Sequence, residues 1–315
     1  MITKRLKPAA ALCAAIIIAV LTAAFRVQAQ TSDNGPVKND QSTSAGTTSS
    51  LSTAPAENQP TGGGVETNAE NEDELTKLAK ETQNPVANLI SVPFENNFNF
   101  GIGPNKVMLY DLNIEPVIPI SLSEDWNLIT RTIIPVLSEN SPAPGIPSAA
   151  GLGDINPTLF LSPANASRKL FWGVGPTFTF PTATDPLLGS QKWSAGPAVV
   201  ALTMQGHWVI GALMNNQWSF AGWGARDVNS ALFEPFINYN FGHGWYAASD
   251  DEITANWEAT DPNRWTLPLG GGVGKIVRLG KLPINVRAEA YGNVVKPTGG
   301  PSWQFRFEIT FLFPR

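Results

Sequence analysis

Between residues 88 and 313 apolar and polar side chains alternate along the sequence, and this alternation constrains the fold more than any other feature. In VMLYDLNIEPVIPISL, residues 107–122, apolar side chains hold most even positions, whereas Asp111, Asn113 and Glu115 hold odd ones. The ending WQFRFEITFLFPR likewise alternates large apolar residues with Gln304, Arg306 and Glu308. A period of two is typical of a β-strand whose two faces meet different environments.

Twelve such stretches follow one another, separated by clusters of Gly, Pro, Asn and Asp. They cover residues 88–102, 107–122, 125–136, 152–163, 169–182, 193–205, 207–220, 228–242, 244–258, 263–279, 281–295 and 301–313. Single-chain bacterial outer-membrane barrels have an even number of antiparallel strands and both termini in the periplasm. The sequence therefore predicts an all-β fold, an antiparallel transmembrane β-barrel of about twelve strands, over residues 86–315.

The lengths of the connections agree with this topology. The connections expected in the periplasm include SED, QGH, GHG and LGK, whereas longer ones such as SENSPAPGIPSAA and TATDPLLGSQK fall where external loops are expected. Nine of the eleven connections follow the rule of short periplasmic turns and longer outer loops, and GPNK and PANASRK are the exceptions. Tryptophans also gather near strand ends, as an interfacial girdle requires: Trp126, Trp172, Trp193, Trp208, Trp218, Trp245, Trp257, Trp265 and Trp303.

In a barrel of this kind the apolar faces meet lipid and the polar faces line the lumen. Phe305, Phe307 and Ile309 are then expected outside and Arg306 and Glu308 inside. A soluble β-sandwich is the alternative, but only 15% of the residues are charged, and the solvent face of a sandwich would normally carry more Lys and Glu.

The register of the final hairpin follows if Lys296–Gly299 forms its turn, with Pro297 at the favoured second position. Arg287 then lies opposite Glu308, and Glu289 lies opposite Arg306, so that both cross-strand pairs are opposite in charge. The same register places Gly292 beside Trp303, where an aromatic ring can cover a strand glycine.

Eleven charged residues are expected to point into the lumen: Glu95, Asp111, Glu115, Arg131, Glu234, Asp250, Glu252, Arg287, Glu289, Arg306 and Glu308. Eight of them are acidic and three are basic, so the lumen should be negative. Two interpretations stay open: a salt-bridge network that fills the barrel, or a lining that selects solutes.

The N-terminal region differs from the rest of the chain. Residues 1–29 have basic residues, an apolar run and a small-residue site ending at Ala29, the plan of a cleaved signal peptide. An uncleaved anchor is the alternative, because the run from Pro8 to Phe25 is near the lower limit for spanning a bilayer. Residues 30–70 are rich in Ser, Thr and Gly and are predicted to be a disordered linker. Residues 71–85 predict a short amphipathic helix, near 72–83, which starts at Asn71 and is stopped by Pro85.

Charge and cysteine content exclude several classes of function. Without residues 1–29, which hold four basic residues and no acid, the chain has 17 basic and 26 acidic residues, a net charge of −9. Nucleic acid is therefore not an expected partner. Cys13 is the only cysteine and leaves with the signal peptide, so neither a disulfide framework nor a thiolate zinc site is expected.

Several segments resemble a known family. GLGDINPTLFLSP (151–163), WGVGPTFTFPTATDPLLGSQKWSAGP (172–197), FINYNFGHGWYAASDDEITANW (236–257) and WTLPLGGGVGK (265–275) are similar to bacterial outer-membrane proteins grouped with the meta-cleavage pathway of phenol degradation, often labelled transporters. The resemblance covers about residues 75–315. It implies an outer-membrane barrel that moves small compounds, with aromatic compounds as the candidate class, and it supplies no catalytic or binding residues.

No catalytic, cofactor or metal site is expected. GGGVGKI at 270–276 fails as a phosphate loop, because Leu269 replaces the first glycine and Ile276 replaces the Ser or Thr that would contact magnesium. His207 and His243, the only histidines, are expected in two periplasmic turns, away from any outer-leaflet serine and separated by two strands. A membrane hydrolase is therefore the weakest hypothesis.

The leading hypothesis is a passive channel or uptake barrel in the outer membrane, with membrane lipid around it and an unidentified small solute inside. The alternative is a plugged barrel whose N-terminal arm anchors a periplasmic partner. The C-terminal strand is expected to be read by the barrel-insertion machinery, with Phe313 as the terminal aromatic residue although Pro314 and Arg315 follow it.

Overall fold

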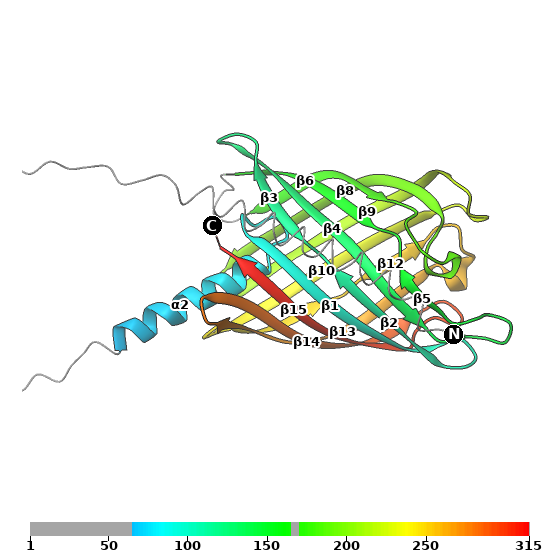
Figure 1. The fold of residues 1–315 in the computed structure, drawn as a ribbon. Helices are drawn as coiled ribbons and strands as arrows, with labels where there is room; N and C mark the ends of the chain where they lie inside the picture. Colours follow the sequence, from blue (N-terminus) through cyan, green and yellow to red (C-terminus); the bar gives the residue numbers. More distant parts are fainter. Residues whose placement is uncertain (1–64, 165–169, 315) are drawn as a thin grey trace, which may run out of the picture.

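The chain forms a closed antiparallel β-barrel with one helix at one end, as seen in a computed structural model that describes residues 65–164 and 170–314 (Figure 1). The predicted signal peptide at 1–29 and most of the predicted linker lie outside the described residues. The elements are α2 (Val65–Thr82), β1 (Ile90–Ile102), β2 (Val107–Ile114), β3 (Val117–Ser121), β4 (Trp126–Glu139), β5 (Ala149–Leu152), β6 (Asn156–Pro163), β7 (Phe171–Thr179), η2 (Pro186–Leu188), β8 (Lys192–Gln205), β9 (Trp208–Gly222), β10 (Asn229–Gly242), β11 (Trp245–Asp250), β12 (Ile253–Asn256), η3 (Asp261–Asn263), β13 (Trp265–Leu279), β14 (Leu282–Val295) and β15 (Trp303–Phe313).

These strands run twelve times between the two ends of the barrel and so form its wall, which confirms the predicted fold. β2 with β3, β5 with β6, and β11 with β12 each form one interrupted crossing, and β1 pairs with β15 to close the ring. Each interruption faces a proline of the neighbouring strand: the amides of Glu115, Gly153 and Asp251 donate to the carbonyls of Pro93, Pro135 and Pro235. Because proline has no amide hydrogen to return, the ladder breaks at these points.

The two ends of the barrel differ. We call the end where β1 begins and β15 ends the short-turn end, and the opposite end the long-loop end (Figure 1). At the short-turn end β10 and β11 are joined by His243 and Gly244 alone, with φ of 53° and 75°, as a two-residue turn with both φ values positive requires. The long-loop end carries residues 140–148, 180–191, 223–228, 257–264 and 296–302. The predicted asymmetry is confirmed, and GPNK is indeed a short connection at the long-loop end.

The inside of the last strand is its polar face, as predicted. Arg306, Glu308 and Thr310 are 3%, 6% and 1% exposed, whereas Phe305, on the other face of the strand, is 37% exposed. The nine predicted girdle tryptophans all lie at or near strand ends. Trp126, Trp172, Trp208 and Trp245 lie near the short-turn end, and Trp193, Trp218, Trp257, Trp265 and Trp303 lie near the long-loop end.

The helix differs from the prediction at its start. α2 begins at Val65, six residues before Asn71, so Asn71 is an interior residue and the linker cannot extend to residue 70. The physical reason is that VETNAE contains neither Gly nor Pro, so nothing in it stops a helix that packing has nucleated further along. The C-terminal end is close to the prediction, because the helix stops at Thr82, three residues before Pro85.

Candidate functional site

The structure brings most of the predicted inward charges together inside the barrel. A hollow of about 130 Å³ is lined by nine of the eleven: Glu95, Glu115, Arg131, Glu234, Asp250, Glu252, Arg287, Arg306 and Glu308. Asp111 and Glu289 do not line it. We call these eleven residues together the charged layer.

Arg287 of β14 is the most connected member of the charged layer. Its Nη1 lies 2.8 Å from Asp250 Oδ2, and its Nη2 lies 2.7 Å from Glu308 Oε2. Carboxylates of Glu289 and Glu95 follow at 3.4 and 3.9 Å. β14 and β15 pair with Arg287 opposite Glu308 and Glu289 opposite Arg306, so the predicted register is confirmed.

Arg306 of β15 connects a second group of acids. It forms an ion pair with Glu252, donates from Nε to Asn97 Oδ1 at 3.2 Å, and lies 3.6 Å from both Glu95 and Glu289. Neither oxygen of Glu289 has a hydrogen-bond partner among the described residues, although its side chain is fully buried. Glu289 is therefore held by charge alone, between the guanidinium groups of Arg287 and Arg306.

The third arginine of the charged layer lies on β4. Arg131 donates from Nε and Nη2 to Glu115 Oε2, at 3.1 and 2.8 Å. Asp111 and Glu234 form no ion pair in the part of the chain that the structure describes, and Asp111 Oδ1 is buried without a hydrogen-bond partner there. With eight acids against three arginines, the charged layer has a surplus of negative formal charge.

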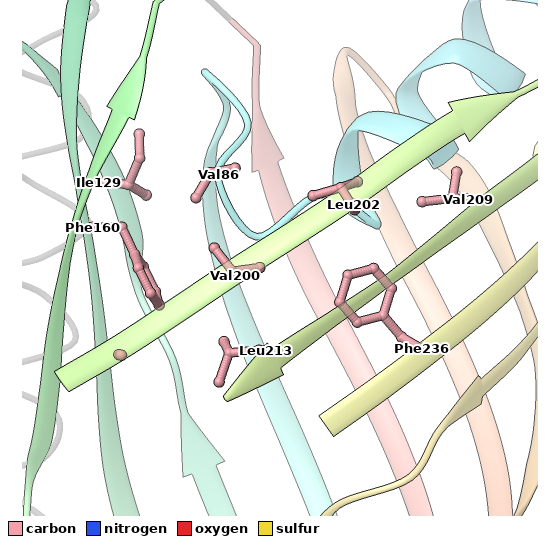
Figure 2. Packing of buried hydrophobic residues seen from close by; sticks show 9 residues of the cluster. Val86, Ile129, Phe160, Val200, Leu202, Val209, Leu213 and Phe236 are labelled. Atoms are coloured by element: carbon pink, nitrogen blue, oxygen red, sulfur yellow. The ribbon is translucent and has the colours of Figure 1, made fainter. Parts of the chain in front are cut away.

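Below the charged layer, toward the short-turn end, the interior is apolar on one side. Ile129, Phe160, Val200, Leu202 and Leu213 point inward from β4, β6, β8 and β9 and form a buried cluster with Phe236 of β10 (Figure 2). The expectation that the inward face is polar is therefore wrong for this part of the wall. The physical reason is that these residues face another part of the same chain instead of water.

That part is the segment between α2 and β1. Val86 reaches the centre of the apolar cluster, close to Phe160 and Val200 (Figure 2). A Cβ atom on Gly173 of β7 would lie 3.0 Å from Val86 Cγ1, so the missing side chain of Gly173 makes room for Val86. Leu78, Ala79 and Leu89 fill the other side of the lumen against Tyr246, Ile276 and Leu312.

We call residues 83–89 the wedge. The sequence analysis misses it, because it assigns residues 86–315 to the barrel and starts the first strand at residue 88, and only the absence of alternation before Ile90 hints otherwise. Asn84 shapes the wedge by accepting from the amide of Val86 through Oδ1, at 3.0 Å, and from the amide of Ala87 through its carbonyl, at 3.0 Å.

The two predictions about strand glycines have different outcomes. Gly292 does pair with Trp303, but nothing lies within 4 Å of a Cβ built on Gly292, because Trp303 stacks on Phe100 of β1 at 4.1 Å instead. Aromatic covering occurs at Gly274, within the GGGVGK stretch, where a Cβ would meet the Tyr246 ring at 2.2 Å. These glycines belong to β13, which confirms their assignment to a strand.

The histidines lie where they were predicted. His207 lies between β8 and β9, with Nδ1 2.7 Å from the carbonyl of Asn240, and His243 lies in the turn between β10 and β11. Among the described residues no group of three or more His, Cys, Asp or Glu side chains is arranged to hold a metal ion. Within the same residues, no helix has the length and hydropathy needed to cross a membrane.

Comparison with solved structures identifies the fold. An outer membrane channel from Pseudomonas putida F1 superposes with a TM-score of 0.55 at 16% identity, over 71% of this chain and 94% of that one. The chain therefore has the fold of an outer-membrane β-barrel. Two other structures are more distant. The NanC porin has a TM-score of 0.45 at 9% identity, over 71% of this chain and 100% of that one. The outer membrane phospholipase A from Escherichia coli has a TM-score of 0.39 at 10% identity, over 71% of this chain and 96% of that one. No family model and no curated protein matches the sequence.

Proposed function

We propose that the protein is a passive outer-membrane channel for small solutes and that the charged layer sets which solutes pass. The observation that supports this most directly is a hollow of about 130 Å³ lined by ionisable groups at the depth of the membrane. Such groups are costly in a bilayer unless they face water or one another, and they commonly mark solute pathways. Under this proposal the short-turn end is periplasmic and the long-loop end is extracellular.

The dimensions of the barrel wall support insertion in an outer membrane. Trp208 and Trp218 lie near opposite ends of β9, ten residues apart. At about 3.3 Å per residue and a strand tilt of about 40°, they are separated by about 25 Å along the barrel axis, which is the height of the apolar band of outer-membrane barrels. Membrane lipid would surround this band, and the signal peptide at 1–29 and the C-terminal strand would serve export and insertion.

The charge of the lining favours small hydrophilic cations. All three arginines are paired with carboxylates, whereas Glu234 lines the hollow without an ion pair in the described chain. Rings of acidic side chains favour cations in channels. Small aromatic compounds, the class implied by the resemblance to phenol-degradation proteins, remain a prediction that this lining does not itself support.

Liposome swelling tests the proposal. Proteoliposomes should swell in an isosmotic solution of a small organic cation faster than in one of an anion of similar size, while control liposomes without protein should not swell. A refolded barrel that passes neither solute and conducts no ions would contradict it. We propose no catalytic role for either histidine.

A second candidate, a plugged anchoring barrel, is favoured by one observation: the C-terminal part of α2 and the wedge pack inside the short-turn end of the barrel. In that case the arm would bind a periplasmic partner. Deleting residues 30–83 distinguishes the two, because an anchor would lose partner binding with unchanged permeability.

A further inference from the structure

The wedge separates two hollows inside the protein. The hollow of about 130 Å³ lies on the side of the charged layer, and a larger one of about 910 Å³ opens toward the short-turn end beside α2. Glu81, Asn84, Ala87 and Leu89 line both. One stretch of chain, a few residues wide, is therefore the wall between them.

Polar contacts of the helix and its end help to hold this region. Arg278 Nη2 lies 2.5 Å from Glu74 Oε2, Lys80 Nζ donates to the carbonyl of Gly206 at 2.8 Å, and the amides of Gln83 and Asn240 exchange two hydrogen bonds of 3.1 Å. These contacts attach the wedge to the barrel at its N-terminal side, and β1 holds it at Ile90.

Val86 is held in place by apolar packing. It fits against Gly173, Phe160 and Val200, and its backbone amide is bonded within the wedge, to Asn84, instead of to the wall. Apolar contacts of this kind have no directional bond to break, so the wedge can leave its position while both of its attachments remain.

We propose that the wedge is a gate and that the inner hollow is the solute compartment it closes from the periplasm. This inference rests on the proposed channel function. The compartment matches the size of one small molecule, since an engineered cavity of about 150 Å³ in another protein holds benzene. Its lining of seven acids and three arginines suits a small organic cation. When the wedge withdraws, the two hollows join and the solute passes.

A reversible disulfide tests the gate. In the full chain carrying Cys13→Ala, Val86→Cys and Gly173→Cys place two thiols together, because a Cβ on Gly173 lies 3.0 Å from Val86 Cγ1, a position that the sulfur of a cysteine at residue 86 can take. Planar-bilayer conductance is measured before and after reduction with dithiothreitol. The single-cysteine variants are the controls and should not respond.

The gate predicts that the oxidised protein conducts far less than the reduced protein, on the order of a hundredfold, since tethering a contact shifts its equilibrium by about 10²–10⁴. Equal conductance in both states would overturn the gate and leave the channel function standing. In case the double variant fails to fold, Val86→Asp supplies a second test. It places an unpaired carboxylate in the apolar cluster and should raise conductance severalfold, whereas Val86→Ile should not. If Val86→Asp conducts no more than wild type, the gate is overturned, and if no variant conducts at all, the proposed function fails with it.

Discussion

Replacing Arg287 by Met should lower the free energy of unfolding far more than replacing any basic residue that lies outside the charged layer. Arg287 neutralises Asp250 at 2.8 Å and Glu308 at 2.7 Å, and Glu289 and Glu95 lie within 3.9 Å. Its side chain is only 14% exposed, so water cannot take over these contacts. Removing one partner of a buried ion pair costs about 3–5 kcal/mol, because the remaining charges stay buried without compensation.

Two matched variants set the scale. Arg131→Met breaks a pair with a single acid, Glu115, and should cost less than Arg287→Met. Arg278→Met breaks the ion pair with Glu74, whose side chains are 41% and 63% exposed, and should cost about 0–1 kcal/mol, as surface pairs do.

The assay is equilibrium unfolding in urea of barrels refolded into lipid vesicles, followed by tryptophan fluorescence. The free energy of unfolding in water and the midpoint are compared at equal slope, so that a change in midpoint reports a change in stability. If Arg287→Met and Arg278→Met unfold at the same urea concentration, the charged layer does not carry the buried electrostatic energy assigned to it.

Two further predictions concern packing and assembly. Gly274→Ala should destabilise the barrel by about 1–3 kcal/mol in the same urea titration, because the new methyl group would meet Tyr246 at 2.2 Å. Gly292→Ala is the control with open space and should not destabilise; equal effects would contradict the argument. Phe313→Ala should slow folding into vesicles more than deletion of Pro314 and Arg315, because β15 ends at Phe313, and the reverse order would refute its role as the terminal aromatic.

The barrel could be predicted from the sequence because one physical rule acts on every strand. Each crossing meets an apolar environment outside and a different one inside, so the alternation of WQFRFEITFLF reports the two faces directly. The pairing of Arg287 with Glu308 followed from a turn and from charge. These are local or neighbouring-strand effects, which a sequence records.

The wedge could not be predicted for the opposite reason. Val86 packs against Phe160 and Val200, far from it in sequence, and the requirement for a side-chain-free position at Gly173 exists only after the barrel has closed. The contact of Trp303 also depends on the closed barrel, because its ring stacks on Phe100 of β1, the strand that closes the ring with β15, and does not cover Gly292. The early start of α2 shows a further limit, since a residue suited to cap a helix can also lie within one.

The central claim is that small cations pass through the charged layer. The most direct measurement is the reversal potential of single channels of the wild-type protein under a tenfold gradient of potassium chloride, with Glu234→Gln and Asp111→Asn as matched variants. The proposed function predicts a reversal potential on the cation-selective side, displaced toward zero when these two uncompensated carboxylates are neutralised. A potential on the anion-selective side, or one unchanged in both variants, would contradict it.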